Sequence, residues 1–190
     1  MLRITVDTNV LDADKIARIR EAVDGLDVEI KTTSVTLRED RRTAPSAPPS
    51  SEPVAETGVY DESLYDSGAI YGGGVIHETW VLGESPLGSA VLGDDDGAVR
   101  FEAILHVIGT ASFPKLGLRD AMTPGQKRQL RDAMILDAHA RERRDVLVSD
   151  DRKGFIGKDG ESRRKLEALC ETRIMTVDEF CVFVSTLRSD

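Results

Sequence analysis

Aromatic residues are scarce in this chain, and so are cysteines. Only 5% of the 190 residues are Phe, Trp or Tyr, so there are few rings on which the bases of a single-stranded nucleic acid could stack. The two cysteines, Cys170 and Cys181, have neither zinc-site spacing nor the pattern of a disulfide-linked secreted domain. We expect both to be buried apolar thiols in a reducing compartment.

The chain also lacks a net positive charge and long apolar runs. The formal net charge of −9 argues against broad electrostatic capture of nucleic acid. A nucleic-acid enzyme stays compatible with this charge, because a metal site needs acids and local basic patches can hold an anion. No apolar run reaches membrane-spanning length, and no charged-then-apolar leader opens the chain. We therefore expect no membrane partner and a cytoplasmic location.

Length and composition predict a single domain over residues 1–190 with an unusual middle. Residues 43–57 hold four prolines among Ser and Ala without periodicity, which predicts a flexible loop. Residues 58–118 are predicted to form an insert within the domain that is β-rich or irregular. We favour a hairpin there, with a strand over 75–82, followed by an element over 99–108 that could be strand or helix.

The two ends of the chain carry clearer patterns, and after Pro124 strands and helices alternate. This alternation is typical of a parallel sheet flanked by helices. We therefore predict an α/β fold, a three-layer α/β/α sandwich with a central, mostly parallel sheet. The expected elements are a strand over 2–6, a helix over 13–23, a β-rich stretch over 28–37, a helix from Pro124 as far as Arg143, a strand over 146–149, a helix over 161–171, a strand over 173–175 and a last helix behind a capping box at Thr176–Glu179.

Acidic residues directly follow two of the expected strands. Asp7 comes after residues 2–6, and Asp150 and Asp151 come after Val146–Ser149. In α/β sheets, ligands bind outside the carboxyl ends of the strands. If these strands are neighbours, their carboxylates lie close together and repel unless a cation neutralises them. Oxygen-only ligands favour Mg²⁺ or Mn²⁺ over Zn²⁺, so we predict a divalent-metal site.

Several stretches that carry these acids resemble the motifs of the PIN-domain family. Asp132 and Asp151 lie 19 residues apart, a separation in the range that the family uses between its third and fourth acidic motifs. The resemblance covers roughly residues 1–40 and 120–184. The similar stretches are Val6–Leu11, Arg131–Leu136, Leu147–Arg152 and Ile174–Phe180.

The resemblance implies a fold similar to that of flap-type nucleases, and it implies ribonuclease activity. Many PIN domains are Mg²⁺- or Mn²⁺-dependent ribonucleases, and they include the toxins of bacterial toxin–antitoxin pairs. The implied reaction is metal-dependent hydrolysis of RNA phosphodiester bonds that leaves a 5′-phosphate. An antitoxin-like protein partner and a homodimer are further expectations from the resemblance.

The metal-binding acids are carried over from the family motifs position by position. Asp7 matches the first acid, Asp132 the third and Asp151 the fourth. Glu39, in Ser34–Glu39, is our choice for the second acid, and Glu78 is its competitor. The resemblance implies that four acids hold one or two divalent ions. Hydrogen bonds that orient the carboxylates are expected from Asn9 and Ser149, and Asp150 is expected either to bind or to orient.

Other charged groups have plainer interpretations. Asp137, five residues past Asp132, is expected at the surface, and Asp94–Gly97 is expected to be a solvated turn. Arg141–Arg144 and Arg163–Lys165 are expected to be solvated helix faces, with phosphate binding as the sharper alternative. No site role is assigned to the three histidines.

Each proposed ligand also has a structural alternative, since an Asp after a strand is often a turn or helix-cap residue. Two competing hypotheses remain for the whole chain. One is a catalytically degenerate PIN-like module for binding or assembly. The other is a phospho-acceptor receiver-like domain, which would need an Asp on the third strand and a Lys on the last, and neither is convincingly placed.

Overall fold

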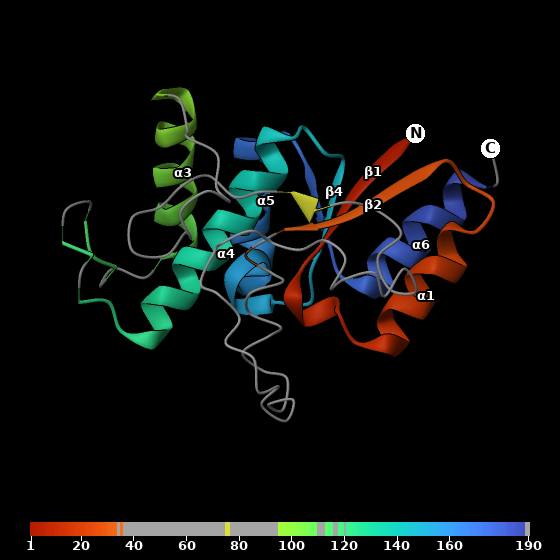
Figure 1. The fold of residues 1–190 in the computed structure, drawn as a ribbon, viewed down its shortest axis with the longest axis horizontal. Coiled ribbons are helices and arrows are strands. Elements are labelled where there is room, and N and C mark those ends of the chain that lie inside the picture. Colours follow the sequence, from red (N-terminus) through yellow and green to blue (C-terminus); the bar gives the residue numbers. More distant parts are fainter. Residues whose placement is uncertain are drawn as a thin grey trace, which may run out of the picture.

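The computed structural model describes residues 1–33, 35, 75–76, 95–109, 113–115, 118–119 and 121–188. Five strands form one sheet in the order β3-β2-β1-β4-β5, and each neighbouring pair is parallel (Figure 1). An α/β fold with a parallel central sheet is therefore confirmed. The strands are β1 (Leu2–Val6), β2 (Val28–Thr33), β3 (Val75–Ile76), β4 (Val146–Val148) and β5 (Arg173–Met175).

Side chains cap the N-termini of α1, α4 and α6. Thr123 and Gln126 form a capping box at the start of the helix whose first residue is Pro124. Thr176 and Glu179 form another at the start of the last helix. None of the helices in the described ranges is both long and apolar enough to cross a membrane. The helices are α1 (Ala13–Val23), α3 (Asp95–Ile108), α4 (Pro124–Arg141), α5 (Glu161–Cys170) and α6 (Val177–Leu187).

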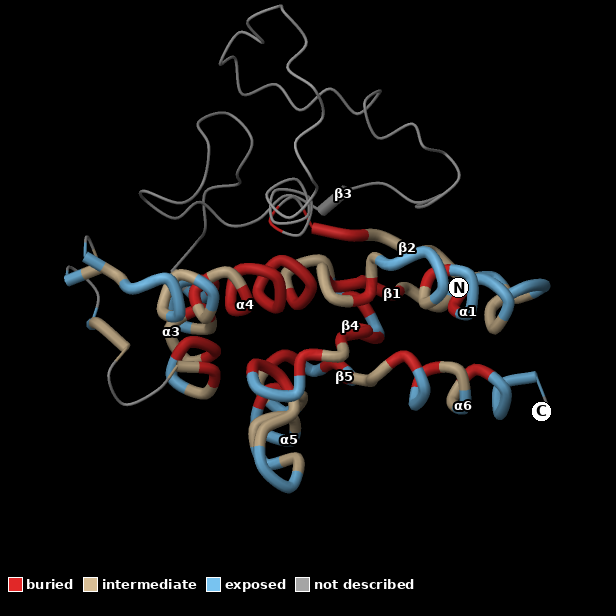
Figure 2. The backbone as a smooth tube through the Cα atoms, turned by 90° about the horizontal axis from the view of Figure 1, so that it is seen from below, coloured by how far each residue is buried: buried red, intermediate tan, exposed pale blue. Residues whose placement is uncertain are grey.

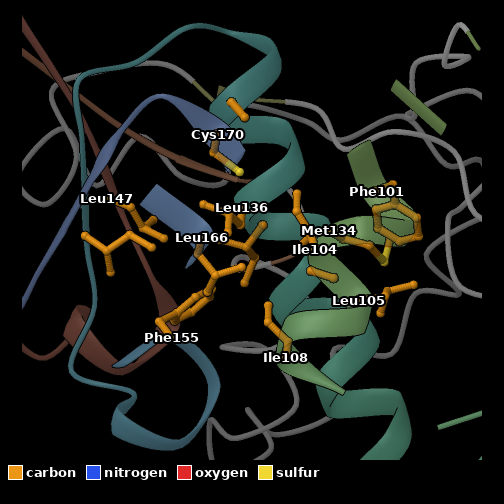
Figure 3. Close-up of a cluster of buried hydrophobic side chains, with 14 of the residues drawn as sticks. Phe101, Ile104, Leu105, Ile108, Met134, Leu136, Leu147, Phe155, Leu166 and Cys170 are labelled. Carbon is orange, nitrogen blue, oxygen red and sulfur yellow. The ribbon is translucent and has the colours of Figure 1, made fainter. Parts of the chain in front are cut away.

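Helices cover both faces of the sheet. Successive strand residues point to opposite faces, so apolar side chains of one strand reach both layers of helices. Ile4 and Val148 belong to a cluster with residues of α1 and α6. Leu147, between Val146 and Val148, belongs to a second cluster built mainly from α3, α4 and α5. Figure 2 shows the buried segments concentrated in the strands and along α4. Figure 3 shows the second cluster, in which Phe155 lies beside Leu166 of α5.

The described parts of the middle segment join the main sheet and core. Val75–Ile76 pairs parallel with β2 and places β3 at the end of the sheet. Residues 99–108, ambiguous by pattern, are helical within α3, and Phe101 and Ile104 are buried against α4. The expected turn at Asp94–Gly97 is wrong from Asp95 onward, because Asp95–Gly97 form the first turn of α3. The predicted loop at 43–57 lies outside the described residues.

A buried ion pair holds β1 and β2 to the end of α4. The Arg144 guanidinium donates to the Glu29 carboxylate at 2.6 Å and to the carbonyl of Ile4 at 2.6 Å. The expectation of a solvated basic cluster over Arg141–Arg144 is therefore wrong for Arg144, which is 1% exposed. Hydrogen bonding by Arg144 lowers the pKa of Glu29 to about 2. Its two Nη atoms donate to one carboxylate and two backbone carbonyls, which offsets the burial of the charge, whereas its buried Nε has no hydrogen-bond partner among the described residues.

Candidate functional site

The sheet reverses its strand order between β1 and β4. The chain leaves β1 for β2 on one side and later returns to place β4 on the other side. Such a reversal opens a crevice at the carboxyl ends of the two strands, where open α/β sheets bind ligands. Val6 lies opposite Val148, and the N–H of Asp7 donates to the Val148 carbonyl at 3.1 Å. The residues that follow β1 and β4 therefore lie next to each other at this edge of the sheet.

The Asp7 carboxylate is buried and accepts hydrogen bonds from Thr8, Asn9 and Ser149. Its Oδ1 accepts from the backbone N–H of Thr8 at 2.6 Å, which caps a short 3₁₀ turn at Thr8–Val10. Its Oδ2 accepts from Asn9 Nδ2 at 2.7 Å and from Ser149 Oγ at 2.7 Å. Asp7 is thus a helix-cap residue, which is the structural alternative given for it above. The hydrogen bonds from Asn9 and Ser149 also fix the orientation of its carboxylate at the end of β1.

Ser149 and Asn9 connect the ends of the two strands. Ser149 Oγ, besides donating to Asp7, accepts from the backbone N–H of Asp151 at 3.1 Å. Asn9 Oδ1 accepts from the backbone N–H of Asp150 at 2.8 Å, and its Nδ2 also lies 3.2 Å from Ser149 Oγ. One hydroxyl and one amide therefore set the positions of both acidic segments.

Asp132 and Asp151 face the same small volume beside Gly154. Asp132 reaches it from α4, and Asp151 begins the π-helical turn Arg152–Ile156. The Oδ1 of Asp151 accepts from the N–H groups of Lys153 and Gly154 at 2.9 and 3.0 Å. A Cβ on Gly154 would lie 3.1 Å from Asp132 Oδ2 and 3.4 Å from Asp151 Oδ2. The missing side chain of Gly154 leaves a cradle between two carboxylate oxygens.

The Asp150 carboxylate makes structural contacts on α1 and α6. Its Oδ2 pairs with Lys15 Nζ at 2.8 Å, and its Oδ1 accepts from the backbone N–H of Val177 at 3.1 Å. Burial alone would raise the pKa of Asp150, but these two donors hold it below its usual value. Of the two roles expected for Asp150, the contacts favour orientation over ligand binding.

The chemistry beside Gly154 fits a hard cation, because the oxygens nearest to its Cβ position belong to the carboxylates of Asp132 and Asp151. Within the described ranges, however, no group of three or more His, Cys, Asp or Glu side chains lies close enough together to hold a metal ion. Glu39 and Glu78, the candidates for the second acid, lie outside the described residues. Mg²⁺ is commonly held by one or two carboxylates plus water and phosphate oxygens. Asp132 and Asp151 provide two carboxylates.

One site contact was not predicted. The Nη2 of Arg128 donates to Asp151 Oδ2 at 2.9 Å. Arg128 lies one helical turn before Asp132 on α4, and residues four apart share a helix face. That spacing was the available signal.

Two expectations about charged residues need correction. Asp137 was expected at the surface, but it is fully buried and pairs with Arg100 of α3 at 2.9 Å. In the cluster Arg163–Lys165, Arg163 pairs with Glu179 at 2.9 Å and Lys165 with Glu161 at 2.7 Å. Two cations of that cluster are therefore already paired with carboxylates of the protein, which weakens the phosphate-binding alternative.

Comparison of the chain with protein-family models and with curated proteins finds no match.

Proposed function

We propose that this protein is a divalent-metal-dependent ribonuclease with a PIN-like α/β/α fold. The observation that carries the proposal is the cradle at Gly154, where the Oδ2 atoms of Asp132 and Asp151 approach one point to within 3.4 Å. Asp151 follows the end of β4, next to the reversal of strand order, and Ser149 connects its N–H to the Asp7 carboxylate. Ligands and catalytic groups of open α/β sheets gather at this location.

Asp132 and Asp151 would hold Mg²⁺ or Mn²⁺. Asp7, which follows β1, does not form a group of three ligands with them, so its carboxylate would act on the site through bound water. When bound, such an ion lowers the pKa of a coordinated water and polarises a phosphate oxygen. Ser149 and Asn9 hold the Asp7 carboxylate by hydrogen bonds of 2.7 Å each. Outer hydrogen bonds of this kind orient the ligands of metal sites.

RNA as the substrate is supported by cations around the site of an otherwise acidic chain. Arg152 and Lys153 directly follow Asp151 and are exposed, and Arg128 reaches Asp151 from α4. Lys and Arg side chains at such positions neutralise phosphates and position a polynucleotide. An antitoxin-like partner and a homodimer remain further predictions, and light scattering of the purified chain tests the latter.

A second candidate is a PIN-like module that binds or assembles without catalysis. Two observations favour it: the described residues contain no group of three metal-binding side chains, and a protein cation already contacts Asp151. This candidate predicts a folded protein that does not bind Mn²⁺ measurably.

The deciding experiment incubates the protein with an unstructured single-stranded RNA and Mn²⁺. We expect cleavage that EDTA abolishes and that Asp132→Asn and Asp7→Asn each lower by about 100-fold, because the first removes a negative ligand and the second removes a negative charge at the site. Asp14→Asn, at an exposed acid on α1, controls for loss of one negative charge. Cleavage that survives EDTA, or full activity of Asp132→Asn, contradicts the proposal.

A further inference from the structure

The contact between Arg128 and Asp151 joins an exposed cation to a buried acid. The side chain of Arg128 is 66% exposed, whereas that of Asp151 is 8% exposed. The two groups meet at 2.9 Å through Nη2 and Oδ2. Arg128 therefore reaches inward from solvent to a carboxylate whose other oxygen is already satisfied by two backbone N–H groups.

The oxygen that Arg128 contacts is the one that borders the cradle. Asp151 Oδ2 and Asp132 Oδ2 both lie within 3.4 Å of the point where a Gly154 Cβ would stand. Two carboxylates that face one volume repel in the absence of a positive charge. The Arg128 guanidinium supplies that charge to Asp151, and it stays protonated at every pH at which proteins fold.

A guanidinium has donors but no acceptor, so it cannot coordinate a metal ion. Arg128 and a divalent cation therefore compete for Asp151 Oδ2. Arg128 can leave at small cost, because its side chain is 66% exposed and a pair with one partner so exposed contributes on the order of 1 kcal/mol. The turn that carries Asp151 is better anchored, since it continues into the buried Phe155 (Figure 3).

We propose that Arg128 is an internal counter-ion for Asp151, which a divalent cation displaces when it binds. This inference rests on the proposed function for the identity of the competitor. It makes metal affinity a balance between the ion and a side chain of the same protein. Displacement also releases a guanidinium at the rim of the site, where it can contact a phosphate of the substrate.

The contact is tested first in EDTA, with the variants Arg128→Gln and Asp151→Asn and the double variant. We expect Arg128→Gln to lower the Tm by about 2 °C in the native background, from loss of a partly buried pair. In the Asp151→Asn background, the same substitution should lower the Tm by less than half as much. Equal shifts in the two backgrounds overturn the inference, whatever the protein does with metal.

The competition is tested by calorimetric titration with Mn²⁺ alone. Arg128→Gln should bind Mn²⁺ about fivefold more tightly than the native chain, the factor that corresponds to about 1 kcal/mol. Lys127→Gln removes one positive charge from the adjacent position of α4 and controls for long-range electrostatics; its affinity should change less than twofold. Unchanged or weaker binding by Arg128→Gln means that Arg128 instead organises the ligand, and overturns the inference.

The two experiments also separate this inference from the proposed function. If the native chain does not bind Mn²⁺ while the thermal coupling to Asp151 is present, the ribonuclease proposal fails, and the displacement by metal fails with it. If the native chain binds Mn²⁺ and Arg128→Gln binds no more tightly, only the inference about Arg128 fails.

Discussion

Ser149 donates its hydroxyl proton to the Asp7 carboxylate at 2.7 Å, and this hydrogen bond joins the ends of the two central strands. The same hydroxyl accepts from the N–H of Asp151. Removing it leaves two buried groups at the crevice with fewer partners. Hydrogen bonds to charged groups contribute about 1.5–3 kcal/mol, so this residue is expected to affect both stability and the site.

Ser149→Ala should lower the free energy of unfolding by about 2 kcal/mol and weaken Mn²⁺ binding by about 10-fold. Urea denaturation and calorimetric titration measure the two effects. Ser185→Ala is a suitable control, because its hydroxyl is exposed and donates to the Val182 carbonyl within the same helix; it should change stability by less than about 0.5 kcal/mol. Unchanged Mn²⁺ affinity in Ser149→Ala would argue against a role for Asp7 in metal binding.

Gly154→Ala tests the cradle. The new Cβ would lie 3.1 Å from Asp132 Oδ2, so the carboxylate must shift by a few tenths of an ångström. We expect the Kd for Mn²⁺ to rise about 10-fold, an effect of the size seen when ligand orientation is disturbed. Gly125→Ala is the matched control, because its Cβ would meet nothing within 4 Å. Equal Mn²⁺ affinities of the two variants would place the metal elsewhere.

Glu29→Gln should be at least as destabilising as Arg144→Met. Loss of the carboxylate leaves the guanidinium, 1% exposed, without a counter-charge, and breaking a buried pair in this way costs about 3 kcal/mol. Loss of the guanidinium instead leaves Glu29 partly exposed and 3.1 Å from Lys31 Nζ. Urea denaturation of both variants at neutral pH gives the comparison. An Arg144→Met variant clearly less stable than Glu29→Gln would contradict it.

Stability should depend on pH through the buried ring of His139. Its nitrogens lie 2.8 Å from Thr5 Oγ1 and 2.6 Å from Thr172 Oγ1. Burial, and then the nearby charge of Arg144, lowers the pKa of His139 to about 3 from its usual 6.5. Below pH 6.5 the unfolded chain takes up a proton that the folded chain does not. Stability therefore falls as pH falls from 6.5 towards 3, by at most about 1.4 kcal/mol per pH unit.

The comparison with His139→Gln isolates this effect. Between pH 6.5 and 5 the native chain should lose stability and the variant should not. The stabilisation by Glu29 is fully present above its unfolded pKa of 4.5 and is lost as the pH falls towards its folded pKa of about 2, so this change lies outside the window. Urea denaturation gives the free energy of unfolding of both proteins at each pH. Parallel pH profiles would show that the ring takes up a proton in the folded chain as readily as in the unfolded chain.

Local sequence patterns were sufficient to predict features that depend on residues close together in the chain. Thr123 and Thr176 each have a partner three residues later, and both cap helices by reciprocal hydrogen bonds. The placement of Asp7 after a buried strand was equally local, since β-branched residues and a polar stop mark the strand. Such signals depend on a few consecutive residues and need no knowledge of the fold.

Charged residues in helices were harder to place from sequence. Asp137 looked exposed because it lies on a different face of its helix from Asp132. It is buried because Arg100, 37 residues away, satisfies its charge. Arg144 followed the same rule with Glu29, 115 residues away. The burial of a charge depends on a distant partner, and a single sequence does not show which partner the fold supplies.

The sequence by itself determined the alternation of strands and helices and the acids that follow β1 and β4, because side-chain periodicity and capping act over a few residues. Tertiary structure alone decided that β1 and β4 are neighbours, that Asp132 meets Asp151 across Gly154, and that Arg128 contacts Asp151. Those outcomes depend on how whole elements pack, and packing energy is summed over contacts between residues far apart in the chain.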